Sequence, residues 1–231
     1  MLKKLKKEVY EANMALPRHG LVILTWGNVS GIDRESGYIV IKPSGVDYDK
    51  MSPDDMAVVD LNGNVIEGSL KPSSDTPTHI ALYKNFPNIG GITHTHSSWA
   101  VGCAQAGIPI TQMGTTHADH FYKSIPITRD LSINEINGDY EYNTGLVIIE
   151  AVKNLGVSES EMPGALVKDH GPFTWGKTPG DSVVNAVVLE EVAKLFVITK
   201  MINVAAPPVA PALMDKHFLR KHGPGATYGQ R

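Results

Sequence analysis

A short apolar segment that ends in two histidines constrains this chain more than any other feature. Residues 89–94 are predicted to form a buried strand, and His94 and His96 stand two positions apart at its end. Side chains at i and i+2 of a strand point to the same side, roughly 6.5–7 Å apart. A third histidine, His170, follows another predicted strand at residues 164–168. If the fold joins these ends, three neutral imidazoles share one metal ion and leave a coordination position open, as in catalytic zinc sites.

The alternative is that these histidines are ordinary polar residues. The chain has nine histidines, so one His-x-His pair is weak evidence by itself. A lone histidine is more often a satisfied polar side chain than a ligand. The pairing with His170 and the polar segments described below favour the metal site. Three imidazoles suit Zn²⁺, and they also suit Co²⁺ and Ni²⁺.

The composition indicates an ordinary globular chain. A length of 231 residues suits one large domain with a sizeable core. The net charge is −3 and Lys and Arg do not cluster, so nucleic acid and anionic membranes are not expected as partners. No segment is apolar for long enough to span a bilayer. The single cysteine, Cys103, excludes an internal disulfide and fits a reducing cytoplasm.

Alternating helical and strand patterns predict an α/β sandwich. Helices are expected at residues 2–16, 77–86, 99–106, 142–155 and from Asp181, as the N-cap, to residue 201. Strands are expected at residues 21–24, 37–42, 56–60, 65–67, 89–94, 108–110, 125–127 and 164–168. A hairpin at Asn62-Gly63 and the irregular spacing argue against a regular parallel array. The proline-rich residues 205–211 are expected to be a stiff connector to the tail.

Residues 171–178 satisfy the phosphate-loop pattern G-x-x-x-x-G-K-T, so a nucleoside triphosphatase has to be considered. A phosphate loop wraps successive backbone N–H groups around the phosphates. Here Pro172 removes one such group, and Phe173 and Trp175 add bulk where close approach is needed. The following helix, expected from Asp181, also begins too late. The pattern is therefore predicted to be fortuitous.

Three segments in the first half of the chain are suited to bind an anion. They are Gly27-Asn28, Lys42-Pro43-Ser44-Gly45 and Lys71-Pro72-Ser73-Ser74-Asp75-Thr76-Pro77. Backbone N–H groups, hydroxyls and an ammonium can hold a phosphate, and the third segment opens a helix whose dipole would help. Each segment alone has a simpler explanation, since Asp75 could be a helix cap and Ser44-Gly45 a turn. Three of them beside a predicted metal site favour an anionic ligand.

Seven blocks of sequence, in order along the chain, resemble the class II aldolase and epimerase family over essentially its whole length. The blocks are LTWGNVS (24–30), IKPSGV (41–46), KPSSDTPTH (71–79), HTH (94–96), GTTHAD (114–119), DHGPF (169–173) and KHFLRKHG (216–223) with YGQ (228–230). The resemblance implies one domain, residues 1–231, folded as a three-layer α/β/α sandwich around a central mixed, largely antiparallel sheet. It also implies that the tail, residues 205–231, reaches a subunit interface.

The activity implied by the resemblance is the reversible conversion of L-ribulose 5-phosphate to D-xylulose 5-phosphate. The C4 hydrogen is not acidic, because C4 is not adjacent to the C2 carbonyl, so proton abstraction cannot invert this carbon. Retro-aldol cleavage between C3 and C4 gives an enediolate and glycolaldehyde phosphate, and re-addition to the other face of the rotated aldehyde inverts C4. One divalent metal per subunit, expected to be Zn²⁺ on His94, His96 and His170, would stabilise the enediolate charge.

The resemblance also assigns the remaining site residues. Asp119 and Tyr228 are the implied acid and base, although Asp119 could be a turn residue and Tyr228 part of a frayed tail. Asp75 is implied at or near the metal, where aldolases of the family carry Glu as the base. The implied phosphate and substrate contacts are Gly27, Asn28, Lys42, Ser44, Gly45, Ser73, Ser74, Thr115, Glu141, His217 and Arg220. The implied assembly is a cytoplasmic cyclic homotetramer with active sites at subunit interfaces.

Two other functions compete with the epimerase. An aldolase that releases its cleavage products is opposed by Asp75 together with Asp119 and Tyr228. A non-catalytic protein that binds sugar phosphates would have no use for a metal with an open position and an acid–base pair.

Overall fold

Seven strands form one sheet in the order β4-β3-β2-β1-β5-β7-β6. The computed structural model describes residues 2–223, 225 and 226. The strands are β1 (Asn28–Asp33), β2 (Tyr38–Ile41), β3 (Ala57–Val59), β4 (Val65–Glu67), β5 (Gly91–His94), β6 (Gly164–Val167) and β7 (Gly171–Gly176). The helices are α1 (Lys3–Arg18), α2 (Thr76–Asn85), α3 (Ser98–Gln105), α4 (Thr115–Ala118), α5 (Ile133–Asn137), α6 (Tyr140–Asn154), α7 (Pro179–Ile202) and α8 (Pro211–His222), with 3₁₀ helices at Tyr48–Lys50 and Pro53–Asp55.

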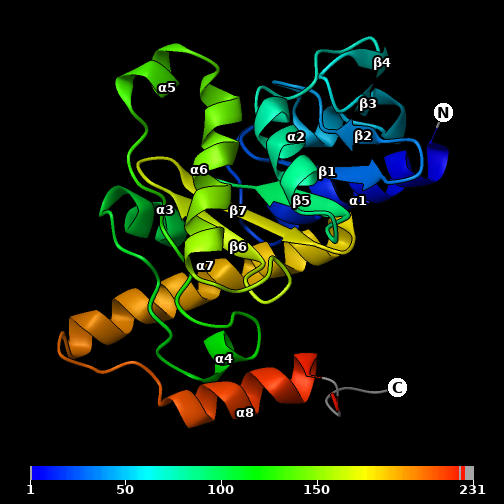
Figure 1. Ribbon diagram of the computed structural model, residues 1–231. Coiled ribbons are helices and arrows are strands. Elements are labelled where there is room, and N and C mark those ends of the chain that lie inside the picture. Colours follow the sequence, from blue (N-terminus) through cyan, green and yellow to red (C-terminus); the bar gives the residue numbers. More distant parts are fainter. Residues whose placement is uncertain (1, 224, 227–231) are drawn as a thin grey trace.

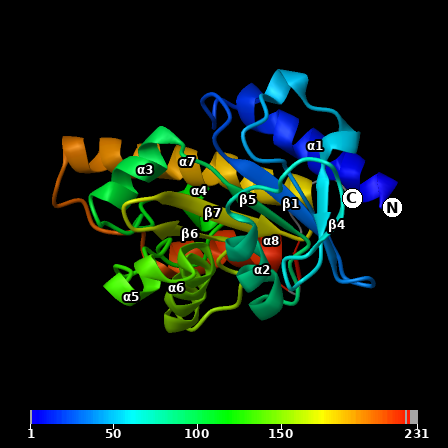
Figure 2. The ribbon, with the colours of Figure 1, turned by 90° about the horizontal axis from the view of Figure 1, so that it is seen from above.

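Helices cover both faces of the sheet (Figures 1 and 2). Helices α1, α3 and α7 lie on one face, and α2 and α6 lie on the other. All six pairs of named strands are antiparallel. Within the described residues, the parallel pairing is an isolated bridge between Ile127 and Leu166. The predicted three-layer α/β/α sandwich with a largely antiparallel sheet is therefore confirmed.

The strands divide their side chains between two apolar layers, as their two-residue period requires. On β2, Ile39 joins the core under α2 and α6, whereas its neighbour Val40 joins the core under α1. Both residues are fully buried. The sheet is thus buried on both faces, which is why β2 reads as a continuous apolar run.

Three glycines allow the first turn of α7 to lie directly on the sheet. Gly31, Gly91 and Gly176 are neighbours in register on β1, β5 and β7. A Cβ atom on Gly91 would lie 2.4 Å from the backbone nitrogen and Cα of Pro179, the first residue of α7. Next to this contact, the hydroxyls of Thr93 and Ser182 are 2.7 Å apart. The close approach therefore requires a residue without a side chain at position 91.

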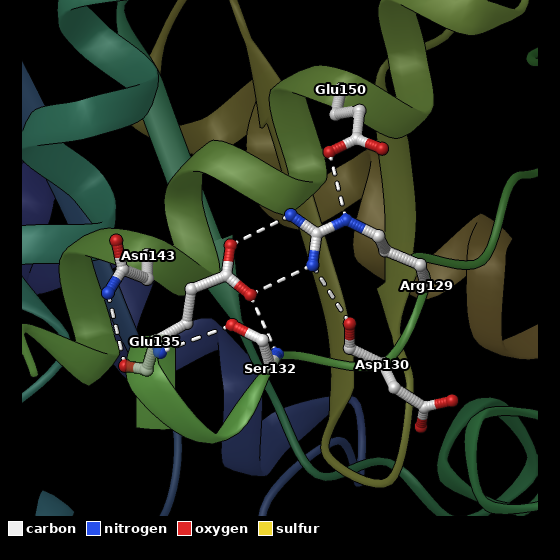
Figure 3. A network of polar contacts seen from close by, with 6 residues as sticks. All are labelled: Arg129, Asp130, Ser132, Glu135, Asn143 and Glu150. Carbon is white, nitrogen blue, oxygen red and sulfur yellow. Dashed lines mark hydrogen bonds and ion pairs between the residues drawn. The ribbon is translucent and has the colours of Figure 1, made fainter. Parts of the chain in front are cut away.

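A charged network holds α5 against α6 on the opposite face (Figure 3). The Arg129 guanidinium donates to both carboxylate oxygens of Glu135, at 2.8 and 2.9 Å, and to Glu150 at 3.1 Å. Ser132 and Glu135 form a capping box at the start of α5. The Arg129 guanidinium lowers the pKa of Glu135 to about 2. The network fixes the chain just before α6, the helix that packs against α2.

The first strand of the sheet does not lie where the sequence predicts it. Residues 21–24 form no strand, and Leu24 adopts a φ of +55°. β1 begins instead at Asn28, in a segment without the apolar alternation of a strand. The reason is that Asn28 and Ser30 face polar groups of α2 while Gly31 makes room for α7.

The segment with the phosphate-loop pattern forms strand β7. It pairs with β5 and β6, so it is extended and cannot wrap around a phosphate. One argument from the sequence was nevertheless wrong, because α7 begins at Pro179 and not at Asp181. Its N-cap is Thr178, whose hydroxyl oxygen accepts the N–H of Asp181 at 3.1 Å.

Two other predicted strands, residues 108–110 and 125–127, are reduced to isolated bridges, one of which joins Ile110 and Ile125. The remaining predicted elements are present with ends shifted by a few residues. After the proline-rich connector the chain forms α8, which lies beside α4 (Figure 1). In the described part of the chain no helix has both the length and the apolar character needed to cross a membrane.

We predict that Gly91→Ala lowers the free energy of unfolding by about 3 kcal/mol or more, because the new Cβ meets backbone atoms that cannot move alone. Gly180→Ala is the matched control in the first turn of α7. Gly180 is exposed and a Cβ there meets nothing closer than 3.8 Å, so this variant should be neutral or gain up to about 1 kcal/mol. Urea unfolding of both variants measures the difference, and equal stabilities would contradict the packing argument.

Candidate metal centre and active-site pocket

The structure brings the three predicted metal ligands together. His94 ends β5, His96 follows it, and His170 lies in the turn between β6 and β7. One ring nitrogen from each histidine lies within 4.8 Å of the other two. The ring centroids are 4.7 to 5.1 Å apart. Strands β5 and β7 are neighbours in the sheet, which is why residues 74 positions apart in sequence meet here (170 − 96).

The hydrogen bond of His94 fixes which of its nitrogens faces the centre. Its Nδ1 lies 3.0 Å from the carbonyl oxygen of Pro172. A carbonyl can only accept, so Nδ1 carries the proton and Nε2 keeps its lone pair. That Nε2 lies 3.1 Å from Nε2 of His96, and the His94 ring stacks on Phe173 with centroids 4.1 Å apart. Metal-binding histidines are typically oriented by such a second hydrogen bond.

Burial keeps two of these histidines, His96 and His170, in the form that binds a metal. It lowers the pKa of His170 to about 3, with His94 adding to the effect. Burial, again with His94, also lowers the pKa of His96. Neutral imidazoles are the ligating form. Three imidazoles that each bring one ring nitrogen to the same point fit a divalent ion such as Zn²⁺.

Asp75 belongs to the same site and does not act as a helix cap. It occupies the N-cap position of α2, but its side chain makes no capping hydrogen bond. Instead, its Oδ2 accepts from Nδ2 of Asn28 at 2.7 Å. Burial alone would raise the pKa of Asp75, but His94, His79 and the Asn28 amide outweigh it and lower the pKa. The carboxylate is therefore ionised beside the histidines, although it lies outside their converging group.

The three histidines line a pocket of about 460 Å³, and residues of all three predicted anion-binding segments line it as well. Its lining consists of Thr25, Trp26, Gly27, Asn28, Lys42, Pro43, Ser44, Gly45, Ser73, Ser74, Asp75, His94, His96 and His170. Trp26 was not predicted as a site residue, although its ring lies 6.1 Å from that of His96. An aromatic residue next to Gly27-Asn28 is the signal that could have identified it.

Asn28 links the metal side of the pocket to the anion side. Its Nδ2 donates to Asp75 and, at 3.1 Å, to Oγ of Ser73. Oγ of Ser73 also accepts the backbone N–H of Asp75 at 3.3 Å. The Ser73 oxygen therefore receives two donors, and its own proton is free to donate to a ligand.

Lys42 is buried, which excludes the alternative of a solvated surface lysine. Its Nζ donates to the carbonyls of Val46 at 3.0 Å, Pro43 at 3.3 Å and Thr25 at 3.4 Å. It also lies 4.8 Å from the ring centroid of Tyr48. Burial lowers the pKa of Lys42 to about 8. The Lys42 ammonium thus joins the loop at Thr25 to the loop at residues 43–46, and both loops contribute to the lining of the pocket.

The other predicted site residues lie elsewhere in the chain. Asp119 follows α4 and pairs with α8, through His217 at 3.0 Å and Arg220 at 3.1 Å. Thr115 is the first residue of α4, and Glu141 lies in the first turn of α6, where its carbonyl accepts from Thr78 at 2.6 Å. These residues do not line the metal pocket of their own chain. Tyr228 lies outside the described residues.

Comparison with known proteins agrees with this geometry. The family described as "Class II Aldolase and Adducin N-terminal domain" matches residues 7–197. The chain is 57% identical over 230 residues to L-ribulose-5-phosphate 4-epimerase UlaF of Salmonella paratyphi C (strain RKS4594), covering 100% of both chains.

Solved structures share the fold at lower identity. An L-fuculose 1-phosphate aldolase superposes with a TM-score of 0.77 at 22% identity, covering 93% of this chain and 94% of that one. The structure of "YgbL, a putative aldolase/epimerase/decarboxylase from Escherichia coli" superposes with a TM-score of 0.74 at 19% identity, covering 93% of this chain and 97% of that one. With most of its length matched by the family and a full-length relative at 57% identity, the chain belongs to the class II aldolase family.

Proposed function

We propose that this protein interconverts L-ribulose 5-phosphate and D-xylulose 5-phosphate by inverting C4. The observation that carries the proposal is one pocket that holds three convergent imidazoles and three anion-binding segments. A phosphorylated ketopentose needs both parts, one for its carbonyl end and one for its phosphate. The relatives with 57% identity over the full length carry the name of this activity.

Inversion at C4 proceeds by cleavage and re-formation of the C3–C4 bond, since the C4 hydrogen is not acidic. We propose one divalent ion per subunit, Zn²⁺, held by His94, His96 and His170 with Asp75 beside them. When bound, the ion supplies Lewis acidity that stabilises the negative charge developing on the ketose fragment. The pocket must also retain glycolaldehyde phosphate while its aldehyde rotates.

The anion side of the pocket would hold the phosphate and so keep the cleaved fragment bound. Ser44, Gly45, Ser73 and Ser74 line that side, and the Ser73 hydroxyl has its proton free to donate. Gly27 and Asn28 complete it, with Asn28 orienting Ser73 as well as Asp75. The Lys42 ammonium adds positive charge next to these groups.

The proton-transfer groups we propose are Asp119 and Tyr228. Asp119 does not line the metal pocket of its own chain, so we propose that it acts in the pocket of another subunit. This supports a cyclic homotetramer with sites between subunits, to which Thr115, Glu141, His217 and Arg220 would contribute. An apolar groove of about 770 Å³ between α3 and α7, with Met201 and Val204 exposed at its edge, is a surface that subunit contacts would cover.

The short Asp75 distinguishes the proposed epimerase from an aldolase. Its carboxylate is held by the Asn28 amide, so we expect it to be poorly placed to protonate the ketose fragment and release it. We propose one domain with its tail, residues 205–231, at the subunit interface. We also propose a cytoplasmic location, because a membrane retains an anionic sugar phosphate.

We predict that His96→Ala loses the bound zinc after dialysis and epimerises at least about 100-fold more slowly, since a ligand is missing. His19→Ala, an exposed histidine at the end of α1, is the control and should behave as the wild type. Metal analysis and separate assays of D-xylulose 5-phosphate and glycolaldehyde phosphate measure the outcome. Accumulation of the aldehyde by the wild-type protein would identify an aldolase instead.

We predict that Tyr228→Phe and Asp119→Asn each lower kcat by about 100-fold or more while the zinc content is unchanged, as expected for proton-transfer groups. Mixing His96→Ala subunits with Tyr228→Phe subunits tests whether sites are shared. Random mixing would restore roughly a quarter of the sites if ligands and tyrosine come from adjacent subunits of a ring. No recovered activity in confirmed mixed oligomers would place both groups in one chain.

We predict that KM for the sugar phosphate rises as the pH increases through about 8. The pKa of Lys42 is lowered to about 8, so its ammonium is present below this pH and is lost above it. The phosphate stays a dianion in this range, because its second pKa is about 6. Lys42→Met should show a high KM that is independent of pH between 7 and about 9, and a wild-type slope in this variant would assign the titration to another group.

A further inference from the structure

A buried chain of polar groups lies directly under the pocket and is not explained by the proposed chemistry. Ser30, His79 and Tyr83 are at most 1% exposed. Oγ of Ser30 lies 2.7 Å from Nδ1 of His79 and 2.8 Å from the hydroxyl of Tyr83. Buried polar groups of this kind are costly unless they are paired, so the arrangement is a specific one.

These hydrogen bonds extend the contact between β1 and the start of α2 that holds Asp75. Asn28 and Ser30 are two residues apart on β1 and point to the same side, about 6.7 Å apart. Asp75 and His79 are four residues apart, one helical turn or about 6 Å along the axis, and the N–H of His79 donates to the carbonyl of Asp75. Because these spacings match, the pairs Asn28–Asp75 and Ser30–His79 form successive cross-links between the two elements.

The donor and acceptor of each hydrogen bond among Tyr83, Ser30 and His79 can be assigned. Burial lowers the pKa of His79 to about 3, so the ring is neutral and carries one N–H. In the described part of the chain, Ser30 is the acceptor within reach of the Tyr83 hydroxyl. Tyr83 therefore donates to Ser30, Ser30 donates to Nδ1 of His79, and the imidazole proton is on Nε2. Any other order leaves a buried hydroxyl proton without an acceptor, whereas in this order the buried N–H of His79 Nε2 is the group without a partner among the described residues.

His79 is also close to the charged groups of the centre. It lies one helical turn from Asp75. The Asp75 carboxylate attracts a proton on the His79 ring and so offsets part of the lowering of the His79 pKa that burial causes. Its ring meets the edge of Phe173, with centroids 6.1 Å apart, and Phe173 in turn stacks on the ligand His94. The chain thus contacts the supports of both Asp75 and a metal ligand.

We propose that Tyr83, Ser30 and His79 are positioning residues that fix the first turn of α2 against β1, so that Asp75 and His94 are held ready for the metal ion. These residues do not touch the ion. Their effect is preorganisation. Without these hydrogen bonds the first turn of α2 could shift and carry the Asp75 carboxylate away from the three histidines. The proposal rests on the proposed function only in taking the three histidines as the metal site.

Ser30→Ala, compared with Ser182→Ala, tests the proposal. Both serines are fully buried and bond another hydroxyl, but Ser182 contacts Thr93 on the opposite face of the sheet. Zinc affinity of the folded apoprotein is measured without substrate, by competition with a chromophoric chelator. We expect Ser30→Ala to bind zinc about tenfold more weakly, as do variants of groups behind metal ligands, and Ser182→Ala to stay within about twofold of the wild type despite a similar loss of thermal stability.

A second pair of variants covers the case in which Ser30→Ala does not fold. Tyr83→Phe removes the first hydroxyl of this hydrogen-bonded series, and Tyr122→Phe removes a hydroxyl that donates to Asp215 of α8, away from the pocket. Weaker zinc binding in Tyr83→Phe alone supports the proposal, and equal zinc affinities in either pair of variants overturn it. Since no substrate is present, a failed epimerase assay would overturn the proposed function and leave this result unaffected.

Discussion

The site depends on the register of β5 between its two neighbours. His94 stands opposite Asn28 on β1 and opposite Phe173 on β7. On one side this places the imidazole next to the residue that holds Asp75, and on the other it provides the ring on which the imidazole stacks. A slip by one residue would turn His94 to the opposite face, against α7, and no metal site would form.

The same register explains the two unlike faces of the central strands. Thr93 and Gly91 face α7, where a hydroxyl pair and a missing side chain allow close packing. Ile92 and His94 face α2 and α6, where the apolar core gives way to the pocket at the end of the strand. Rigid packing on one face thus supports a polar site on the other, and a site built on strands is held more precisely than one built on loops.

Much of the site could be predicted from the sequence because its residues are grouped locally. The histidine pair, the third histidine after a strand, and three short polar segments are each visible as spacing or composition, and the structure gathers them in one pocket. Strand β1 could not be predicted, because its periodicity reflects specific partners of Asn28 and Ser30 instead of burial of apolar side chains. The start of α7 was misplaced since Thr178 and Asp181 are both good caps, and only the packing of Pro179 on Gly91 decides between them. Asp119 is a different case, because the structure pairs it with His217 and Arg220 of α8 and it does not line the metal pocket of its own chain.

The Asn28 side chain explains why one carboxylate length suits this pocket. Its amide has two N–H groups, one given to Asp75 and the other to Ser73. The carboxylate is therefore fixed at a set distance from the serine that faces the anion side. A glutamate at position 75 is one methylene longer, so it could keep the bond to Asn28 only by bending, or reach past it towards a bound sugar. The position of Asp75 thus follows from the same amide that also orients Ser73, and the two halves of the pocket cannot be altered independently.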